Sequence, residues 1–102
     1  MDRKIQQGDV LLRSCATIPG KAKKKTDTIV AYGEVTNHKH EVIGEGVEVF
    51  EDETGVLYVS APSGGRIRHE EHDPIELPPG NYTISIVQEY DHFAEEARNV
   101  AD

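Results

Sequence analysis

The most constraining feature of this 102-residue sequence is an alternation of side chains near its C-terminal end. In NYTISIVQEY, residues 81–90, the apolar side chains of Tyr82, Ile84 and Ile86 fall on one face of an extended chain. The rigid turn Pro-Pro-Gly at residues 78–80 comes directly before this segment. A period of two sustained over the whole segment predicts a β-strand.

Shorter segments of the same character fill most of the chain, and Gly, Pro or Asn residues separate them at the intervals typical of small all-β domains. The expected strands are residues 9–14, 28–36, 40–43, 47–50, 56–61, 66–72, 74–77 and 81–90. Asp91 could cap a short terminal helix over residues 91–101. The sequence therefore predicts one mainly β domain over residues 1–102, an antiparallel β-barrel or sandwich with a short C-terminal helix.

The net charge of −8 is unevenly distributed along the chain. Residues 1–30 hold seven Lys or Arg against three Asp, whereas residues 31–102 hold four basic against sixteen acidic residues. Direct binding of duplex nucleic acid is not expected, because such surfaces need clustered cations. The lysine-rich stretch at residues 20–27 is expected to be a solvated loop, although it could contact a phosphate or an acidic partner.

Neither a membrane span nor a signal peptide is expected. No stretch approaches the ~18 consecutive apolar residues of a transmembrane helix, and the first ten residues are charged rather than apolar. The single Cys15 excludes an intrachain disulfide and a multi-cysteine zinc motif. We therefore expect a cytoplasmic protein that does not associate with membranes, and the sequence leaves its oligomeric state open.

Four of the five histidines occur in two pairs, each beside glutamate. His38 and His40 are one residue apart, so an extended strand projects both from one face about 7 Å apart. His69 and His72 would lie on opposite faces of a regular strand, unless the chain turns before Pro74. Clustered His and Glu residues are typical of metal and catalytic sites. We therefore expect these four histidines to bind a metal ion.

Imidazole ligands suit several first-row ions, so the expected cofactor is a divalent metal, with zinc first and iron, manganese or nickel as alternatives. Glu41 and Glu71 could support the site by fixing the imidazole tautomers, or could be solvated acids at the sheet edges. An open coordination position would allow metal-assisted hydrolysis, whereas four protein ligands would make the ion structural. The sequence leaves open whether the protein is an enzyme.

A second hypothesis is an acidic protein–protein interaction module without a metal. The stretches Glu41–Glu53 and Glu70–Glu76 would then form a negative face that docks on a basic protein partner. Such a module could be a phage-encoded modulator of a host protein. The histidines would in that case be polar residues of a solvated surface.

The segment GEVTNHKH resembles the first metal motif of the cupins, which are small β-barrels with a glycine, an HxH pair and a glutamate. The matching positions are Gly33, His38, His40 and Glu45. The resemblance implies a cupin-like barrel with metal ligands at the two histidines. The sequence departs from the second cupin motif at Thr83, where a histidine would stand.

A wider resemblance covers residues 7–102. The order QGDVLL, AYGEVTNHKHEV and HEEHDPIELPPGNYTISIVQEY resembles that of a family of small uncharacterised proteins from bacteria and their phages. The resemblance implies that the two histidine segments belong to one functional unit, and it supplies no activity.

Overall fold

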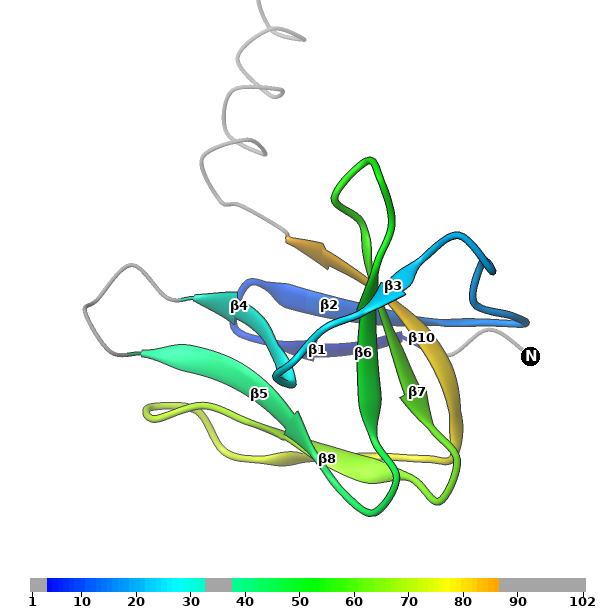
Figure 1. The fold of residues 1–102 in the computed structure, drawn as a ribbon. Helices are drawn as coiled ribbons and strands as arrows, with labels where there is room; N and C mark the ends of the chain where they lie inside the picture. The colour runs from blue at the N-terminus through cyan, green and yellow to red at the C-terminus, as the bar shows by residue number, and fades with distance from the viewer. Residues whose placement is uncertain (1–3, 33–37, 87–102) are drawn as a thin grey trace, which may run out of the picture.

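A computed structural model describes residues 4–32 and 38–86, which form ten strands in two antiparallel sheets (Figure 1). The strands are β1 (Lys4–Gln7), β2 (Val10–Cys15), β3 (Lys23–Lys24), β4 (Ile29–Tyr32), β5 (Lys39–Ile43), β6 (Glu48–Glu51), β7 (Leu57–Ala61), β8 (Gly65–Arg68), β9 (Ile75–Leu77) and β10 (Gly80–Ile86). The expected mainly β, antiparallel class is confirmed. The expected helix over residues 91–101 lies outside the described residues.

The larger sheet has the strand order β1-β2-β10-β7-β6-β3, with the alternating segment near its centre. Strand β10 pairs with β2 on one side, where Ile84 lies opposite Leu12, and with β7 on the other, where Tyr82 lies opposite Val59. Tyr82 and Ile84 are buried as the alternation predicts, whereas Ile86 at the end of the strand is 42% exposed.

The smaller sheet has the strand order β4-β5-β8-β9. The pairing of β4 with β5 is irregular, since its register shifts between Ile29 and Ala31. Within β5 the burial alternates, and His40 and Val42 face inward. The inward face of this strand is therefore apolar at one end and carries an imidazole at the other.

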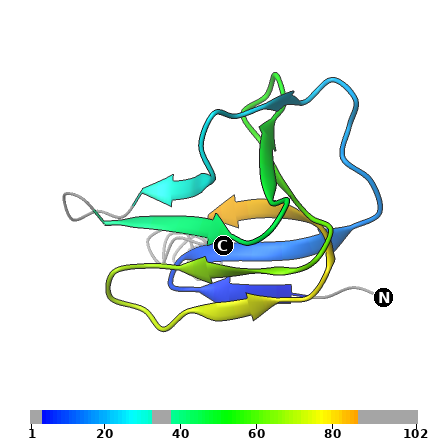
Figure 2. The same cartoon turned by 60° about the horizontal axis from the view of Figure 1, so that its bottom comes forward.

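Inward-facing residues of both sheets form a single hydrophobic core. Its buried members are Val10, Leu12, Val30, Val42, Val49, Val59, Ala61, Ile67, Leu77, Tyr82 and Ile84. Full burial of an aliphatic side chain of this size stabilises the fold by about 1.5–3 kcal/mol. At one side of the molecule the edge strands β1 and β9 lie beside each other (Figure 2), so the two sheets meet there.

Three elements differ from the sequence prediction. Strand β1 was not expected, because three of its four side chains are polar; it pairs along its length with β2 across the turn at Gly8, whose φ is +58°. Two residues of the expected lysine loop form β3, in which Lys23 pairs with Glu51. The strand expected over residues 66–72 ends at Arg68.

Within residues 4–32 and 38–86, no helix is long and apolar enough to cross a membrane.

Candidate functional site

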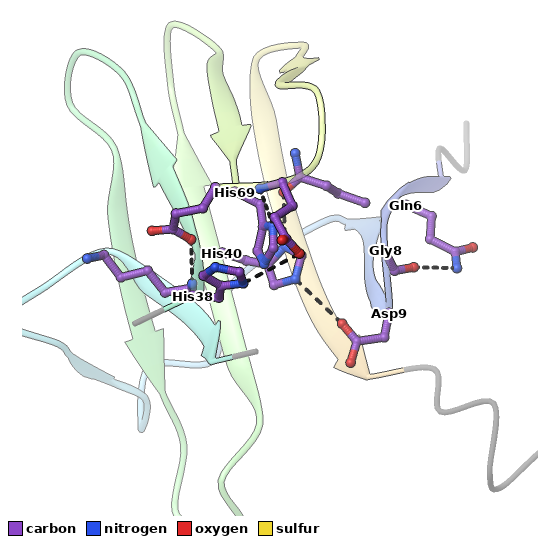
Figure 3. A network of polar contacts seen from close by, with 10 residues as sticks. Gln6, Gly8, Asp9, His38, His40 and His69 are labelled. Carbon is purple, nitrogen blue, oxygen red and sulfur yellow. Dashed lines mark hydrogen bonds and ion pairs between the residues drawn. The ribbon is translucent and has the colours of Figure 1, made fainter. Parts of the chain in front are cut away.

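Four imidazole rings lie together where the start of β5 faces the loop between β8 and β9, and Figure 3 labels His38, His40 and His69 among them. The ring centroids of His40 and His69 are 4.3 Å apart, and those of His69 and His72 are 4.7 Å apart. The centroid of His38 lies 5.4 Å from that of His69. The structure thus brings the two sequence pairs into one group, which we call the histidine cluster (His38, His40, His69 and His72).

The positions of the strand ends explain how these rings meet. His40 lies on the inward face of β5, and His38 precedes this strand on the same side of the alternation. Because β8 ends at Arg68, residues 69–74 form a loop rather than a strand, and both His69 and His72 can approach His40. Of the two arrangements left open for the second pair, the chain turn is the one observed.

His40 is held by a buried glutamine that the sequence did not single out. Gln7 Nε2 donates hydrogen bonds to the main-chain carbonyls of Ile67, at 3.1 Å, and Asp73, at 2.8 Å. Since the amide nitrogen must face these two acceptors, Oε1 accepts from His40 Nδ1, at 2.9 Å. His40 therefore carries a proton on Nδ1, and in the neutral ring the lone pair is on Nε2.

Gln7 and His40 are the buried polar side chains of the described residues, each 2% exposed, and they contact each other. Burial lowers the pKa of His40, and the neighbouring His69 acts in the same direction, while the carboxylate of Asp9 partly opposes both. The folded state thus favours the neutral imidazole at His40, which is the form that can bind a metal ion.

The turn between β1 and β2 closes one side of the cluster. Asp9 Oδ1 lies 3.5 Å from His40 Nε2, and Figure 3 shows this carboxylate directed toward the imidazoles. A Cβ atom added at Gly8 would lie 2.8 Å from His72 Nε2, which is closer than real Cβ atoms come. The turn therefore packs directly on His72, and glycine provides the room.

The glutamates near the cluster have different surroundings. The main-chain N–H of Glu71 donates to His69 Nδ1 at 3.0 Å, and Glu71 Oε1 lies 3.6 Å from His38 Nδ1. Glu70 Oε1 accepts from the main-chain N–H of Lys39 at 2.8 Å, which ties the loop to β5 and lowers the pKa of Glu70.

The other two glutamates that the sequence singled out lie away from the imidazoles. Glu41 accepts a hydrogen bond from Thr28 at 3.4 Å and lies 3.8 Å from Arg68 Nε. Because neighbouring residues of a strand alternate, it projects from the face of β5 opposite to His40. Glu45, the glutamate of the cupin resemblance, is exposed in the turn that follows β5, at the opposite end of the strand from His38. Gly33 lies outside the described residues.

As these side chains stand, no group of three or more His, Cys, Asp or Glu residues within residues 4–32 and 38–86 is arranged to hold a metal ion. Two rings, His38 and His69, present Nδ1 to Glu71 rather than to a common centre. Metal binding would therefore require some rings to rotate.

A cavity of about 610 Å³ lies elsewhere, between the lysine-rich stretch and the β6–β7 loop. Its lining residues are Lys21, Lys23, Lys24, Lys25, Glu51, Asp52 and Glu53. Lys24 pairs with Glu48 at 2.8 Å and Lys25 with Asp27 at 3.3 Å. Since its cations are partly paired and face three carboxylates, this cavity does not favour an anionic ligand.

A family model described as "Domain of unknown function (DUF8820)" matches residues 6–87. No curated protein and no solved structure matches the chain. The match includes both histidine pairs and the turn between β1 and β2.

Proposed function

The chain belongs to the family described as Domain of unknown function (DUF8820), and we propose that it binds a divalent metal ion through its histidine cluster. The observation that carries the proposal is the environment of His40. This imidazole is buried, its Nδ1–H is donated to Gln7, and its Nε2 is left as an electron-pair donor beside other imidazoles.

The hydrogen bond from His40 to Gln7 is of the kind that orients metal-bound histidines. A metal-bound histidine usually donates its other ring N–H to a fixed acceptor, which sets the tautomer and the ring orientation. A buried imidazole and a buried amide are costly to desolvate, so a purely structural core would favour apolar side chains at these positions. The burial of Gln7 and His40 is therefore better explained if His40 Nε2 binds a ligand.

The remaining imidazoles can complete the site by rotation of their side chains. His72 is exposed and His69 is partly exposed, and both lie on the loop after β8 rather than in a strand. If the hydrogen bond from the Glu71 N–H to His69 Nδ1 broke, either ring nitrogen of His69 could face the ion. Bringing Nε2 of His40 and nitrogens of His69, His72 and His38 to about 2.0–2.1 Å from one ion would give the tetrahedral site that zinc prefers.

Zinc is the proposed ion, and iron, manganese or nickel are the alternatives that imidazole ligands also suit. With all four histidines bound, the ion would be structural. With three bound, the fourth position would hold a water molecule whose pKa the ion lowers, and the site could support metal-assisted hydrolysis. In this proposal the two sheets form the walls of a small barrel or sandwich. Of the positions that resemble the cupin motif, only His38 and His40 are ligands.

The test is elemental mass spectrometry of the untagged protein, purified without chelators and then dialysed against zinc. We expect close to one equivalent of metal per chain in the wild type and a loss of most of it in His40→Ala. His92→Ala is the matched control, because His92 is the one histidine outside the proposal, and this variant should keep its metal. Circular dichroism of each variant establishes that it is folded.

Absence of metal from the folded wild-type protein, even after dialysis against each of the four ions, would contradict the proposal. The second hypothesis, an acidic module that docks on a basic protein partner, would then account for the excess of carboxylates. In that case His40→Ala should leave partner binding unchanged, whereas charge reversal at Glu48, Glu51 and Glu53 should abolish it.

A further inference from the structure

When His40 is neutral, its contact with Asp9 joins two atoms that have no hydrogen to donate. His40 Nδ1 carries the ring proton, since it donates to Gln7, so Nε2 of the neutral ring is an acceptor. A carboxylate oxygen is also an acceptor. With His40 neutral, two such electron-pair donors repel each other unless a cation lies between them.

The distance between these two atoms fits a shared ion better than a direct contact. Asp9 Oδ1 and His40 Nε2 are 3.5 Å apart, which is beyond the roughly 2.7–2.9 Å of a charge-assisted hydrogen bond. Two ligand atoms bound to one tetrahedral zinc at about 2.0–2.2 Å are separated by roughly 3.3–3.5 Å. The observed spacing matches the separation expected for two ligands of one tetrahedral ion.

These two atoms come from different sheets. His40 lies on β5 of the four-stranded sheet, and Asp9 lies in the turn between β1 and β2 of the six-stranded sheet. The same turn already reaches across, because Gln7 donates to Ile67 and Asp73 and Gly8 packs on His72. An ion held here would bind both sheets at the edge where β1 and β9 lie side by side.

We propose that Asp9 is a ligand of the metal ion, and that the ion joins the six-stranded sheet to the four-stranded sheet. This inference rests on the proposed metal-binding function and places the carboxylate of Asp9, which lies outside both histidine pairs, in the fourth position of the form of the site with three histidines bound. It also assigns the ion a structural effect, because the ion links two elements that are about 30 residues apart in the chain, the turn that contains Asp9 and the strand that contains His40. A site of imidazoles and one carboxylate suits zinc, iron and manganese rather than a soft ion such as Cu(I).

The experiment compares Asp9→Asn with Asp27→Asn in the full chain. The two aspartates are matched, since their side chains are 47% and 46% exposed and each lies near one nitrogen-bearing side chain. Zinc affinity is measured by calorimetry. Hydrogen–deuterium exchange, followed by mass spectrometry with and without zinc, is measured over residues 4–10, 38–43 and 67–75.

We expect zinc to slow exchange in all three segments of the wild type and of Asp27→Asn. In Asp9→Asn we expect zinc to bind at least roughly 10-fold more weakly, the smallest loss seen when even an outer partner of a ligand is removed. At saturating zinc this variant should keep the protection of residues 38–43 and 67–75 and lose that of residues 4–10. Asp9→Ser, which removes the carboxylate without an amide in its place, should behave in the same way.

Wild-type affinity and wild-type protection of residues 4–10 in both Asp9 variants would overturn the inference and leave the histidine site standing. Failure of the wild type to bind zinc, iron, manganese or nickel would overturn both proposals. The inference would also fail if NMR of the metal-free protein found protons on both nitrogens of His40 at neutral pH, since Nε2–H would then donate to Asp9. Exchange rates of the metal-free variants establish that the β1–β2 turn is formed before zinc is added.

Discussion

The two sheets bury different chemistry with the same alternation of side chains. The central strands of the six-stranded sheet bury apolar residues, among them Leu12 and Ile84. The four-stranded sheet turns Val42 and Ile67 inward, but the next inward position along β5 is His40. The polar partner of this histidine, Gln7, comes from an edge strand of the other sheet.

The apolar core of the six-stranded sheet therefore provides stability, whereas the end of the four-stranded sheet at His40 is available for binding. Apolar packing across the six-stranded sheet needs no ligand. The end of the four-stranded sheet contains a buried imidazole whose burial favours its neutral form, and the neighbouring loop is exposed. The following predictions test whether the two regions differ in this way.

The largest expected effect is the loss of apolar packing in β2. Leu12→Ala removes a fully buried side chain and should lower the free energy of unfolding by about 2–5 kcal/mol. Leu11→Ala, at the adjacent position on the opposite and less buried face, should cost clearly less. The measurement is urea denaturation, and equal losses in the two variants would contradict the assignment of β2 to the core.

Zinc should stabilise the wild-type protein by mass action. A ligand that binds only the folded state raises the free energy of unfolding by about 2.7 kcal/mol when its concentration is 100 times Kd. Thermal unfolding with zinc and then with excess chelator measures this difference. Leu11→Ala should keep the zinc-dependent rise in Tm, and His40→Ala should lose it. An equal zinc-dependent rise in Tm in the two variants would mean that zinc binds at a site without His40.

Removal of the glutamine that holds His40 should affect both regions. Gln7→Leu leaves His40 Nδ1 and the carbonyls of Ile67 and Asp73 without their partner. Each buried polar group left unpaired costs about 1–3 kcal/mol, and zinc affinity should fall with the loss of ring orientation. Gln6→Leu is the control, because Gln6 is exposed and its amide donates a hydrogen bond to the carbonyl of Gly8 within the same turn. Denaturation and calorimetry of the two variants should therefore diverge.

The smallest expected effect is a dependence of stability on pH below neutrality. The folded state lowers the pKa of His40, so the unfolded chain binds the proton more readily. Stability should be constant above the ordinary histidine pKa of about 6.5 and should fall as the pH drops below it, levelling off once the folded-state pKa is passed. The slope from one such group cannot exceed about 1.4 kcal/mol per pH unit.

Unfolding free energies measured between pH 7.5 and pH 5.5 in metal-free buffer test this sign. His40→Gln should give a flatter profile. The carboxyls of Asp52 and Glu70, whose pKa values hydrogen bonds lower, contribute only in more acidic solution. A wild-type protein that gains stability as the pH falls through this range would contradict the buried neutral state of His40.

Most of the fold could be predicted from local patterns. Alternation and turn residues were sufficient for β10 and for the other strands with apolar inward faces. Strand β1 could not be found in this way, because its polar sequence is strand-like only through its pairing with β2. Two residues of the lysine stretch form β3 for a similar reason, since pairing with Glu51 and Phe50 decides their conformation.

The sequence also indicated which histidines come together, because an HxH pair on a strand and a pair before Asp-Pro restrict where the rings can point. It did not indicate Gln7 or Asp9. A glutamine in a polar segment is expected to be exposed. Gln7 is buried because it contacts Ile67 and Asp73, about 60 residues away along the chain. The adjoining Gln-Gly-Asp sequence was a weak signal, since only the fold places this turn against His72.

The most direct test of the central claim is a calorimetric titration of the metal-free wild-type protein with zinc at neutral pH. The account predicts one saturable site per chain, present in His92→Ala and absent or much weakened in His40→Ala. Absence of saturable binding in the folded wild type, or equal affinity in the wild type and His40→Ala, would contradict the claim that the histidine cluster is a metal site.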